Sequence, residues 1–387
     1  MKDGWERKKL GDVCEIIKGR KPVLKSTSSE DDLRYLVAKV LRGSKDAEYA
    51  SVHDRNSIQV NEAEIIIICD GSNSGEVFTG YQGILSSTMG KIVKKADINN
   101  DYLRAFLAST FELFNGAKTG SAIPHLDKEG LYALQFPFPP LSEQQRIVAI
   151  LDEAFEGIAT AKANAEKNLK NARALFDSYL NSIFSRRGEG WVEKTLGKLG
   201  TITSSKRIFK SEYVKSGVPF YRTKEIKQLA NGREITTELF ISTVRYKEIK
   251  ASFGVPKKGD ILLTAIGTIG EIYVVDGNND FYFKDGNVLW LKGFNTINPH
   301  FLKYVLISFV ESLNNMAHGA AYSALPIQRI NGHTIFLPPL SVQDKIVEQL
   351  EALLEETKRL QSIYQKKILA LDALKKSILH QAFTGEL

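Results

Sequence analysis

The chain has 387 residues, of which 43% are hydrophobic and 25% are charged. It carries a net charge of +7 and contains two cysteines. This length exceeds what one ordinary core fills, so two or more compact domains are expected, and the composition excludes a disordered chain. The absence of any run of 18 apolar residues and of an apolar signal region favours a cytoplasmic protein without a membrane span, and Cys14 and Cys69 are predicted to be buried thiols rather than disulfide or zinc ligands.

The positive charge is confined to one part of the chain. Residues 1–139 carry 19 basic and 19 acidic side chains, and residues 140–190 and 340–387 each carry 7 and 7. Residues 191–339 carry 19 basic and 12 acidic side chains, and that excess equals the whole net charge. A basic domain beside neutral ones favours a polyanionic partner such as nucleic acid, although an excess of this size also serves solubility.

The first 139 residues predict a mixed α/β domain. An apolar strand is predicted at 13–17 and another at 64–68, and the second ends in a turn with Gly71 and Gly75. The glycines are typical of a hairpin or bulge, whereas the polar side chains of Ser72, Asn73 and Ser74 are predicted to face a partner. A Lys-Thr-Gly-Ser sequence at 118–121 lacks the glycine spacing of a phosphate loop and is at most a loop that faces DNA.

Two long helices are predicted, each after a Pro-Pro sequence. Residues 142–184 contain no proline and would form a helix of about 65 Å, with Ser142 as its N-cap and Ser341 as the N-cap of the second helix. The first helix has small residues along its heptad seam and the second has large ones, so the two are predicted to pair in an antiparallel coiled coil rather than each to cover its own domain. Asn168 and Lys367 fall on seam positions, where they either fix the register or lie where the seam opens to water.

The chain is an internal duplication. Trp5 to Gly11 returns at Trp191 to Gly197 with the pattern Trp-x-x-x-x-Leu-Gly, and Pro-Pro-Leu-Ser-Glu-Gln-Gln-Arg-Ile-Val at 139–148 returns as Pro-Pro-Leu-Ser-Val-Gln-Asp-Lys-Ile-Val at 338–347. Between these anchors the halves share a pattern but few identities. This is what two copies of one scaffold with different targets would show.

Motifs for catalysis on DNA are missing. The Pro-Pro segments lack the preceding Asn or Asp of an amino-methyltransferase, the six histidines form no H-E-x-x-H motif, and no serine lies in a G-x-S-x-G sequence. Two alternatives stay open: a nuclease or methyltransferase with an unrecognised site, and a coiled-coil scaffold that binds no DNA. The basic third part of the chain argues against the second.

Together, the repeated Trp-x-x-x-x-Leu-Gly opening and the repeated Pro-Pro-Leu-Ser-x-Gln sequence with its helix resemble the specificity subunits of type I restriction-modification systems. The resemblance implies an α+β fold with pseudo-twofold symmetry: target-recognition domains at 1–139 and 188–338, and long helices at 140–187 and 339–387 that set a spacer. It implies a non-catalytic chain that binds double-stranded DNA but no cofactor. Two modification subunits would use S-adenosylmethionine, and restriction subunits would use ATP and Mg²⁺.

The candidate DNA contacts are basic or polar residues that follow predicted strands. Phosphate contacts are the modest assignment and contacts with base edges the sharper one, and for each basic residue a merely solvated charge is the alternative. The candidates in the first domain are Lys18, Arg20, Lys21, Lys39, Arg42, Asn73, Thr88, Lys118 and Ser121. Those in the second are Lys206, Arg207, Arg222, Lys224, Thr268 and Asn287, with Ser204 and Ser205 beside them.

Overall fold

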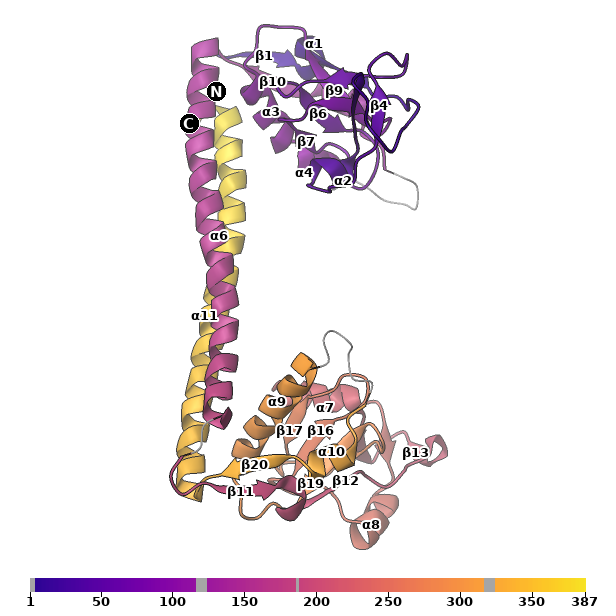
Figure 1. The fold of residues 1–387 in the computed structure, drawn as a ribbon, viewed down its shortest axis with the longest axis vertical. Helices are drawn as coiled ribbons and strands as arrows, with labels where there is room; N and C mark the ends of the chain where they lie inside the picture. The colour runs from indigo at the N-terminus through magenta and orange to yellow at the C-terminus, as the bar shows by residue number, and fades with distance from the viewer. Residues whose placement is uncertain (1–3, 116–123, 186–187, 317–323) are drawn as a thin grey trace. The chain divides into compact units, whose positions relative to one another are not determined.

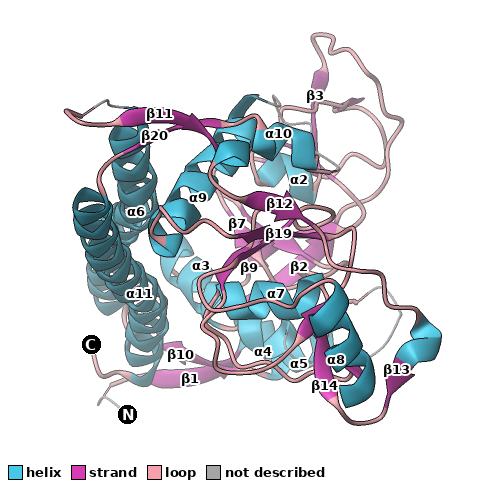
Figure 2. Ribbon diagram, turned by 90° about the horizontal axis from the view of Figure 1, so that it is seen from below, coloured by secondary structure: helices cyan, strands magenta, loops and turns pink. Residues whose placement is uncertain are grey.

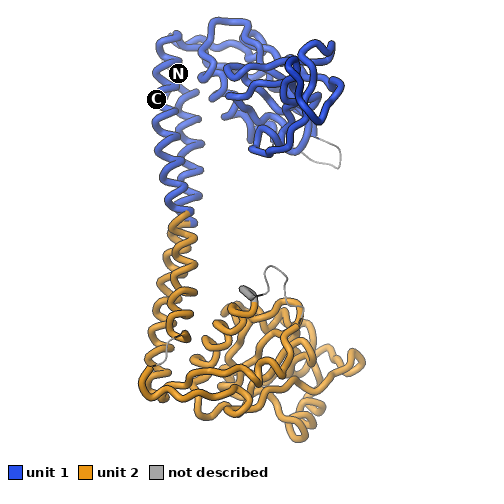
Figure 3. Tube along the Cα trace, in the orientation of Figure 1, with its two compact units in different colours: residues 1–166, 365–387 blue, residues 167–364 orange. Residues whose placement is uncertain are grey.

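The computed structural model describes residues 4–115, 124–185, 188–316 and 324–387. The chain divides into two compact units, shown in different colours in Figure 3. Unit 1 comprises Met1–Glu166 and Gln365–Leu387, and unit 2 comprises Lys167–Tyr364. Each unit therefore contains a globular part, the beginning of one long helix and the end of the other.

The globular part of unit 1 is built around a four-stranded antiparallel sheet in the order β2-β9-β6-β7 (Figure 1). All four isoleucines of β6 are buried because alternate side chains enter different cores. Ile65 and Ile67 face the core that contains the helix residue Tyr102, and Ile66 faces a core formed with Leu36 and Leu85. The strands are β2 (Cys14–Lys18), β6 (Ile65–Ile68), β7 (Val77–Phe78) and β9 (Met89–Lys94).

A second four-stranded sheet and a two-stranded sheet complete unit 1. The second sheet has the order β4-β3-β8-β5, in which β3 and β8 are parallel, and the two-stranded sheet pairs β1 with β10. The strands are β1 (Glu6–Lys9), β3 (Asp32–Leu36), β4 (Tyr49–Ser51), β5 (Gln59–Val60), β8 (Gly83–Leu85) and β10 (Gln135–Phe138). The helices are α1 (Leu10–Val13), α2 (Ala38–Leu41), α3 (Asn100–Ser109), α4 (Phe111–Asn115) and α5 (Lys128–Ala133).

Unit 2 repeats this topology except at one sheet edge. Its sheets have the orders β12-β19-β16-β17, β13-β15-β14-β18 and β11-β20, and the parallel pair recurs as β14 with β18. The fourth strand of the second sheet differs, because β5 pairs with β8 in unit 1 whereas β13 pairs with β15 in unit 2. The strands are β11 (Val192–Thr195), β12 (Thr201–Thr203), β13 (Tyr213–Val214), β14 (Val218–Tyr221), β15 (Phe240–Ile241), β16 (Ile261–Thr264), β17 (Ile272–Val274), β18 (Tyr282–Phe283), β19 (Val288–Lys292) and β20 (Thr334–Leu337). The helices are α7 (Thr223–Ala230), α8 (Thr243–Ser252), α9 (Pro299–Met316) and α10 (Ile327–Asn331), with 3-10 turns at Leu196–Lys198 and Lys210–Glu212.

The two predicted long helices are present as α6 (Leu141–Ser185) and α11 (Leu340–Thr384), each of 45 residues (Figure 2). Within unit 1 they run antiparallel, because Arg146 donates to the carbonyl of Leu387 at 2.8 Å and Lys162 contacts Asp372 at 2.7 Å. The prediction of mixed α/β domains in tandem, each followed by a long helix of an antiparallel pair, is confirmed.

The predicted N-caps are wrong, because each helix begins one residue before the predicted serine. Both helices begin at the leucine after Pro-Pro, so Ser142 and Ser341 are exposed residues of the first turn. The residue that fixes each helix start is instead the buried glutamine two positions later. Gln144 donates to the carbonyl of Pro139 at 2.8 Å and accepts from the amide of Asn99 at 2.9 Å. In unit 2, Gln343 donates to the carbonyl of Pro338 and accepts from the amide of Asn298, both at 2.8 Å.

One of the two predicted seam positions is wrong in the second half of each helix, whereas the other holds, with Ala172 buried and Leu371 half-buried. Asn168 and Lys367 are exposed, and the following residues, Leu169 and Ile368, are half-buried in their place. A straight helix drifts by about 20° per heptad, so a four-residue step replaces the three-residue step once the drift has accumulated. The shift also serves the cores, because Phe176 and Leu180 at the end of α6 pack into the core of unit 2.

Candidate nucleic-acid interface

Three candidates of unit 1 lie where strands of its first sheet end. Lys18 is the last residue of β2, Thr88 directly precedes β9, and Asn73 lies in the turn after β6. Asp70, which sequence reasoning missed, lies between them: its carboxylate contacts Lys18 Nζ at 2.7 Å and its amide donates to the carbonyl of Thr88 at 3.1 Å. The glycine after Lys18 allows this approach, because a Cβ on Gly19 would lie 2.2 Å from the carbonyl oxygen of Ser86.

His125 joins this group from a distant part of the sequence. Its Nδ1 lies 2.7 Å from Asp70 Oδ1, and residues 70 and 125 form an isolated β-bridge. Burial would raise the pKa of Asp70, but hydrogen bonds from Lys18 and His125 outweigh it and lower the pKa. No local pattern could have found this pair, because its members are 55 residues apart and meet only after folding.

Arg42 and Asn73 share one acidic partner. Arg42 forms an ion pair with Glu76, and Asn73 Nδ2 lies 3.3 Å from the same carboxylate. Unit 2 repeats the arrangement, since Lys227 of α7 contacts Glu271 at 2.8 Å and Asn231 Nδ2 contacts it at 2.9 Å. The pair recurs in both copies and ties the end of α2 in unit 1, and α7 in unit 2, to the turn between two strands.

In unit 2 the end of β12 is bonded to the loop before β19. The Ser204 hydroxyl donates to the carbonyl of Val288 at 3.1 Å and accepts from the amide of Gly286 at 3.0 Å. Arg207 forms a 2.8 Å ion pair with Asp285 of the same loop, which also carries the half-buried Asn287. The structure therefore brings Arg207 and Asn287 into one region.

Lys206 and Arg222 contact different neighbours. The ammonium of Lys206 lies 5.9 Å from the centre of the Phe253 ring. Arg222 forms a 2.7 Å ion pair with Glu225, whose side chain is fully buried. Burial would raise the pKa of Glu225, but hydrogen bonds from the side chain and backbone amide of Arg222 lower it.

The remaining candidates are spread over both units. Lys39 forms a 3.1 Å ion pair with Asp46. Four others have exposed side chains and make no ion pair with another described residue: Arg20, Lys21, Lys224 and Thr268. Lys118 and Ser121 lie outside the described residues.

Two serines expected beside the DNA contacts are buried. Ser74 is 0% exposed, and its hydroxyl has no hydrogen-bond partner among the described residues. Ser205 is 8% exposed, and its hydroxyl donates to the carbonyl of Phe283 at 2.7 Å. The prediction that these two side chains face DNA is therefore wrong, because both are buried inside their units.

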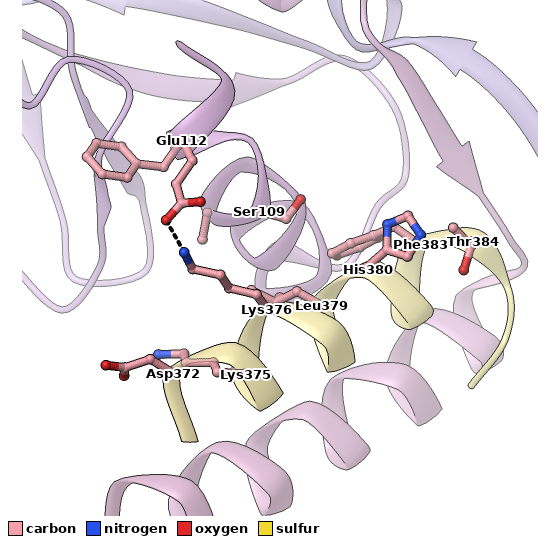
Figure 4. Close-up of a pocket in the computed structure, with 11 residues that line it drawn as sticks. Ser109, Glu112, Asp372, Lys375, Lys376, Leu379, His380, Phe383 and Thr384 are labelled. Carbon is pink, nitrogen blue, oxygen red and sulfur yellow. Dashed lines mark ion pairs between the residues drawn. The ribbon is translucent and has the colours of Figure 1, made fainter. Parts of the chain in front are cut away.

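A groove of about 830 Å³ lies in unit 1 between α3, α4 and the end of α11 (Figure 4). Lys376 and Glu112 form an ion pair across it at 2.5 Å. The repeat shift of 199 residues places Asp177 and Glu311 of unit 2 at the equivalent positions. There burial and the charge of Asp177 raise the pKa of Glu311. At this position the charges of the globular part and the helix are opposite in unit 1 and alike in unit 2.

The part of the chain that the structure describes holds no group of three or more His, Cys, Asp or Glu side chains suited to a metal ion. Both cysteines are buried, as predicted, and burial raises the pKa of the Cys14 thiol to about 11 and also raises the pKa of the Cys69 thiol. Among the described helices, none has an apolar stretch long enough to cross a membrane.

Comparison with known proteins gives a consistent result. The family model described as type I restriction modification DNA specificity domain matches residues 2–171 and 188–367. The MjaVIII specificity subunit of Methanocaldococcus jannaschii, a type I restriction enzyme, is 28% identical over 411 residues, covering 100% of this chain and 93% of the relative.

Two solved structures share the fold. A chain from a type I R-M system has a TM-score of 0.77 and 19% identity and covers 100% of this chain and 99% of that chain. The HsdS subunit from Thermoanaerobacter tengcongensis has a TM-score of 0.63 and 18% identity, covering 100% and 98%.

Proposed function

The chain belongs to the type I restriction-modification DNA specificity family, and on that premise we propose that each unit recognises one half of a bipartite DNA site. The observation that carries the proposal is the internal repeat: the four-stranded antiparallel sheet and the two-stranded sheet each occur twice, with different side chains where the strands end. Two short half-sites, each discriminated by about 1–3 kcal/mol per base pair, give together a selectivity that one alone lacks.

We propose that the helix pair sets the spacing between the half-sites. Each helix has 45 residues, or about 67 Å at 1.5 Å per residue, which is close to two turns of duplex DNA at about 34–36 Å per turn. A continuous helix without proline is stiff, so its length would be transmitted as a fixed register between the half-sites.

Catalysis is assigned to partner subunits in this proposal. Modification subunits would bind S-adenosylmethionine and methylate adenine, and restriction subunits would use ATP and Mg²⁺, in the cytoplasm where the DNA lies. The long helices also carry exposed apolar side chains at which such partners would dock. They are Leu175 of α6 and Ile363, Leu369 and Leu374 of α11.

A domain exchange tests the two-site proposal. Residues 191–337 are replaced by the corresponding segment of a family member with a different target, and methylated adenines are mapped in a genome that also expresses the modification subunit. One half of the methylated sequence should change and the other should stay. A change in both halves would refute the assignment of one half-site to each unit.

A length change tests the spacer. Adding one heptad to both helices should alter the number of base pairs between the half-sites and leave both half-sites unchanged.

The isolated chain, assayed with S-adenosylmethionine or Mg²⁺, should neither methylate nor cleave DNA until partner subunits are added. Activity of the chain alone would favour an enzyme with an unrecognised site.

A further inference from the structure

The two units provide an internal comparison, because equivalent backbone positions are fixed by identical hydrogen bonds. In unit 1 the amide of Cys69 donates to the carbonyl of Thr88, the residue before β9, at 2.8 Å; in unit 2 the amide of Ala265 donates to the carbonyl of Asn287, the residue before β19, at 2.8 Å. The amide of Leu126 donates to the carbonyl of Cys69, and the amide of Leu325 donates to the carbonyl of Ala265, both at 2.8 Å. Position 70 therefore corresponds to position 266, and position 125 to position 324. The strand registers β2–β9 and β12–β19 likewise align Lys18 with Ser204.

Side chains at these three positions differ completely between the units. Unit 1 has an ionic group in which the Asp70 carboxylate, with 16% of the side chain exposed, contacts both Lys18 and His125 at 2.7 Å. Unit 2 has Ser204, Ile266 and Ala324 in their place. Ile266 is 41% exposed, so this region is apolar in one unit and charged in the other.

The fold does not need the ionic group. Unit 2 forms the same β-bridge, Ile266 with Ala324, without any charge there. Ion pairs with exposed partners contribute little stability, and Asp70 loses solvation where it stands. The ion pair Arg42–Glu76 differs from this ionic group, because unit 2 has an equivalent pair, Lys227–Glu271. An ion pair that occurs in both units belongs to the scaffold. Side chains that differ on an identical backbone are where target preference can be encoded.

The geometry points to His125 as a specificity-determining residue of unit 1, with Asp70 as its positioning residue and Lys18 as a second contact. This inference rests on the proposed function. An ionised carboxylate only accepts hydrogen bonds, so the Nδ1 that faces Asp70 carries the proton, and Nε2 of a ring that is 71% exposed is left as an acceptor. An acceptor at this position selects a base that offers an amino group in the major groove, which adenine N6 and cytosine N4 do.

The experiment uses the full chain with its modification subunit and a library of DNA sites randomised in the half-site assigned to unit 1. His125→Ala should lower discrimination at one base pair of that half-site by roughly 5- to 150-fold, the range of one lost base contact, and leave the other half-site unchanged. His125→Gln, which keeps a side-chain acceptor, should retain more of the discrimination than His125→Ala does, and Asp70→Asn should weaken discrimination while His125 is intact.

His53→Gln is the matched control, because His53 is another exposed histidine of unit 1, 3.8 Å from Asp31, and has no role in the inference. Unchanged discrimination in both His125 variants would overturn the inference. Equal effects on both half-sites would overturn it too, because they indicate a general loss of structure. If the domain exchange moves one half-site but these variants do nothing, only this inference fails. If the exchange moves neither half-site, the proposed function fails first.

Discussion

The buried glutamine that follows each Pro-Pro-Leu-Ser sequence should be essential to the stability of its unit. Gln144 is 1% exposed and bonds the start of α6 to the residue that caps α3, since Asn99 Oδ1 accepts from the amide of Tyr102 at 3.0 Å. Gln144→Leu keeps the size of the side chain but leaves the amide of Asn99 and the carbonyl of Pro139 buried without partners. Each such group costs about 1–3 kcal/mol, so the substitution should destabilise unit 1 by about 2–6 kcal/mol.

This loss is a large share of the roughly 5–15 kcal/mol that holds a domain folded, and hydrogen exchange followed by mass spectrometry would measure it. Peptides from α3 and the start of α6 should lose protection in Gln144→Leu, while peptides from unit 2 keep theirs. Gln145→Leu, at the exposed neighbouring position, is the control and should change little. A loss below about 0.5 kcal/mol in Gln144→Leu, or an equal loss in the control, would refute the reasoning.

Three further predictions concern charge. Lys376→Asp should destabilise unit 1 by about 0.2–1 kcal/mol and Asp177→Lys should stabilise unit 2 by a similar amount, in urea titrations at low salt, because one change removes an opposite-charge contact and the other removes a like-charge contact. Burial lowers the pKa of His333, so unit 2 should keep full stability above the ordinary histidine pKa of about 6.5 and lose it as the pH falls below that value. His333→Leu, the residue type at the equivalent position of unit 1, should remove this loss in thermal unfolding at pH 5 and pH 8. Lys224→Gln should reduce the slope of log affinity against log salt by about 1 if Lys224 contacts a phosphate; an unchanged slope would show that it is a solvated charge.

The sequence predicts the repeat, the long helices and the family, because these depend on patterns that recur at a fixed shift. It does not predict the partners of the basic candidates. Folding alone brings an acidic partner to three of them: Asp70 to Lys18, Glu76 to Arg42 and Asp285 to Arg207. The last two pairs are separated by 34 and 78 positions in the sequence. Spacing along the chain carries no information about such contacts, since a two-residue period in a strand says which face a side chain takes but not which strand lies beside it.

The helix seam shows why a correct element can have incorrect details. Both seam positions follow the heptad from Ile147 to Ala165. Beyond it Ala172 stays buried, but the other position moves by one residue where Phe176 fills the core of unit 2. The helix start has a local cause. Ser142 is a good N-cap by residue type, but the carbonyl of Pro140 already accepts from the amides of Glu143 and Gln144, so the first turn begins before the serine.

The internal comparison also assigns different tasks to the two units. Unit 1 is neutral in its first 139 residues, and three of its candidate bases, Lys18, Lys39 and Arg42, are held in ion pairs, whereas Arg20 and Lys21 make none with another described residue. The globular part of unit 2 carries the whole net charge of +7, and its Lys224 makes no ion pair with another described residue. Attraction to phosphates is long-ranged and independent of sequence, whereas a side chain fixed by a neighbour discriminates by geometry. Nonspecific attraction to DNA is therefore expected to depend mainly on unit 2, and raising the salt concentration should weaken a unit 2 half-site more than a unit 1 half-site.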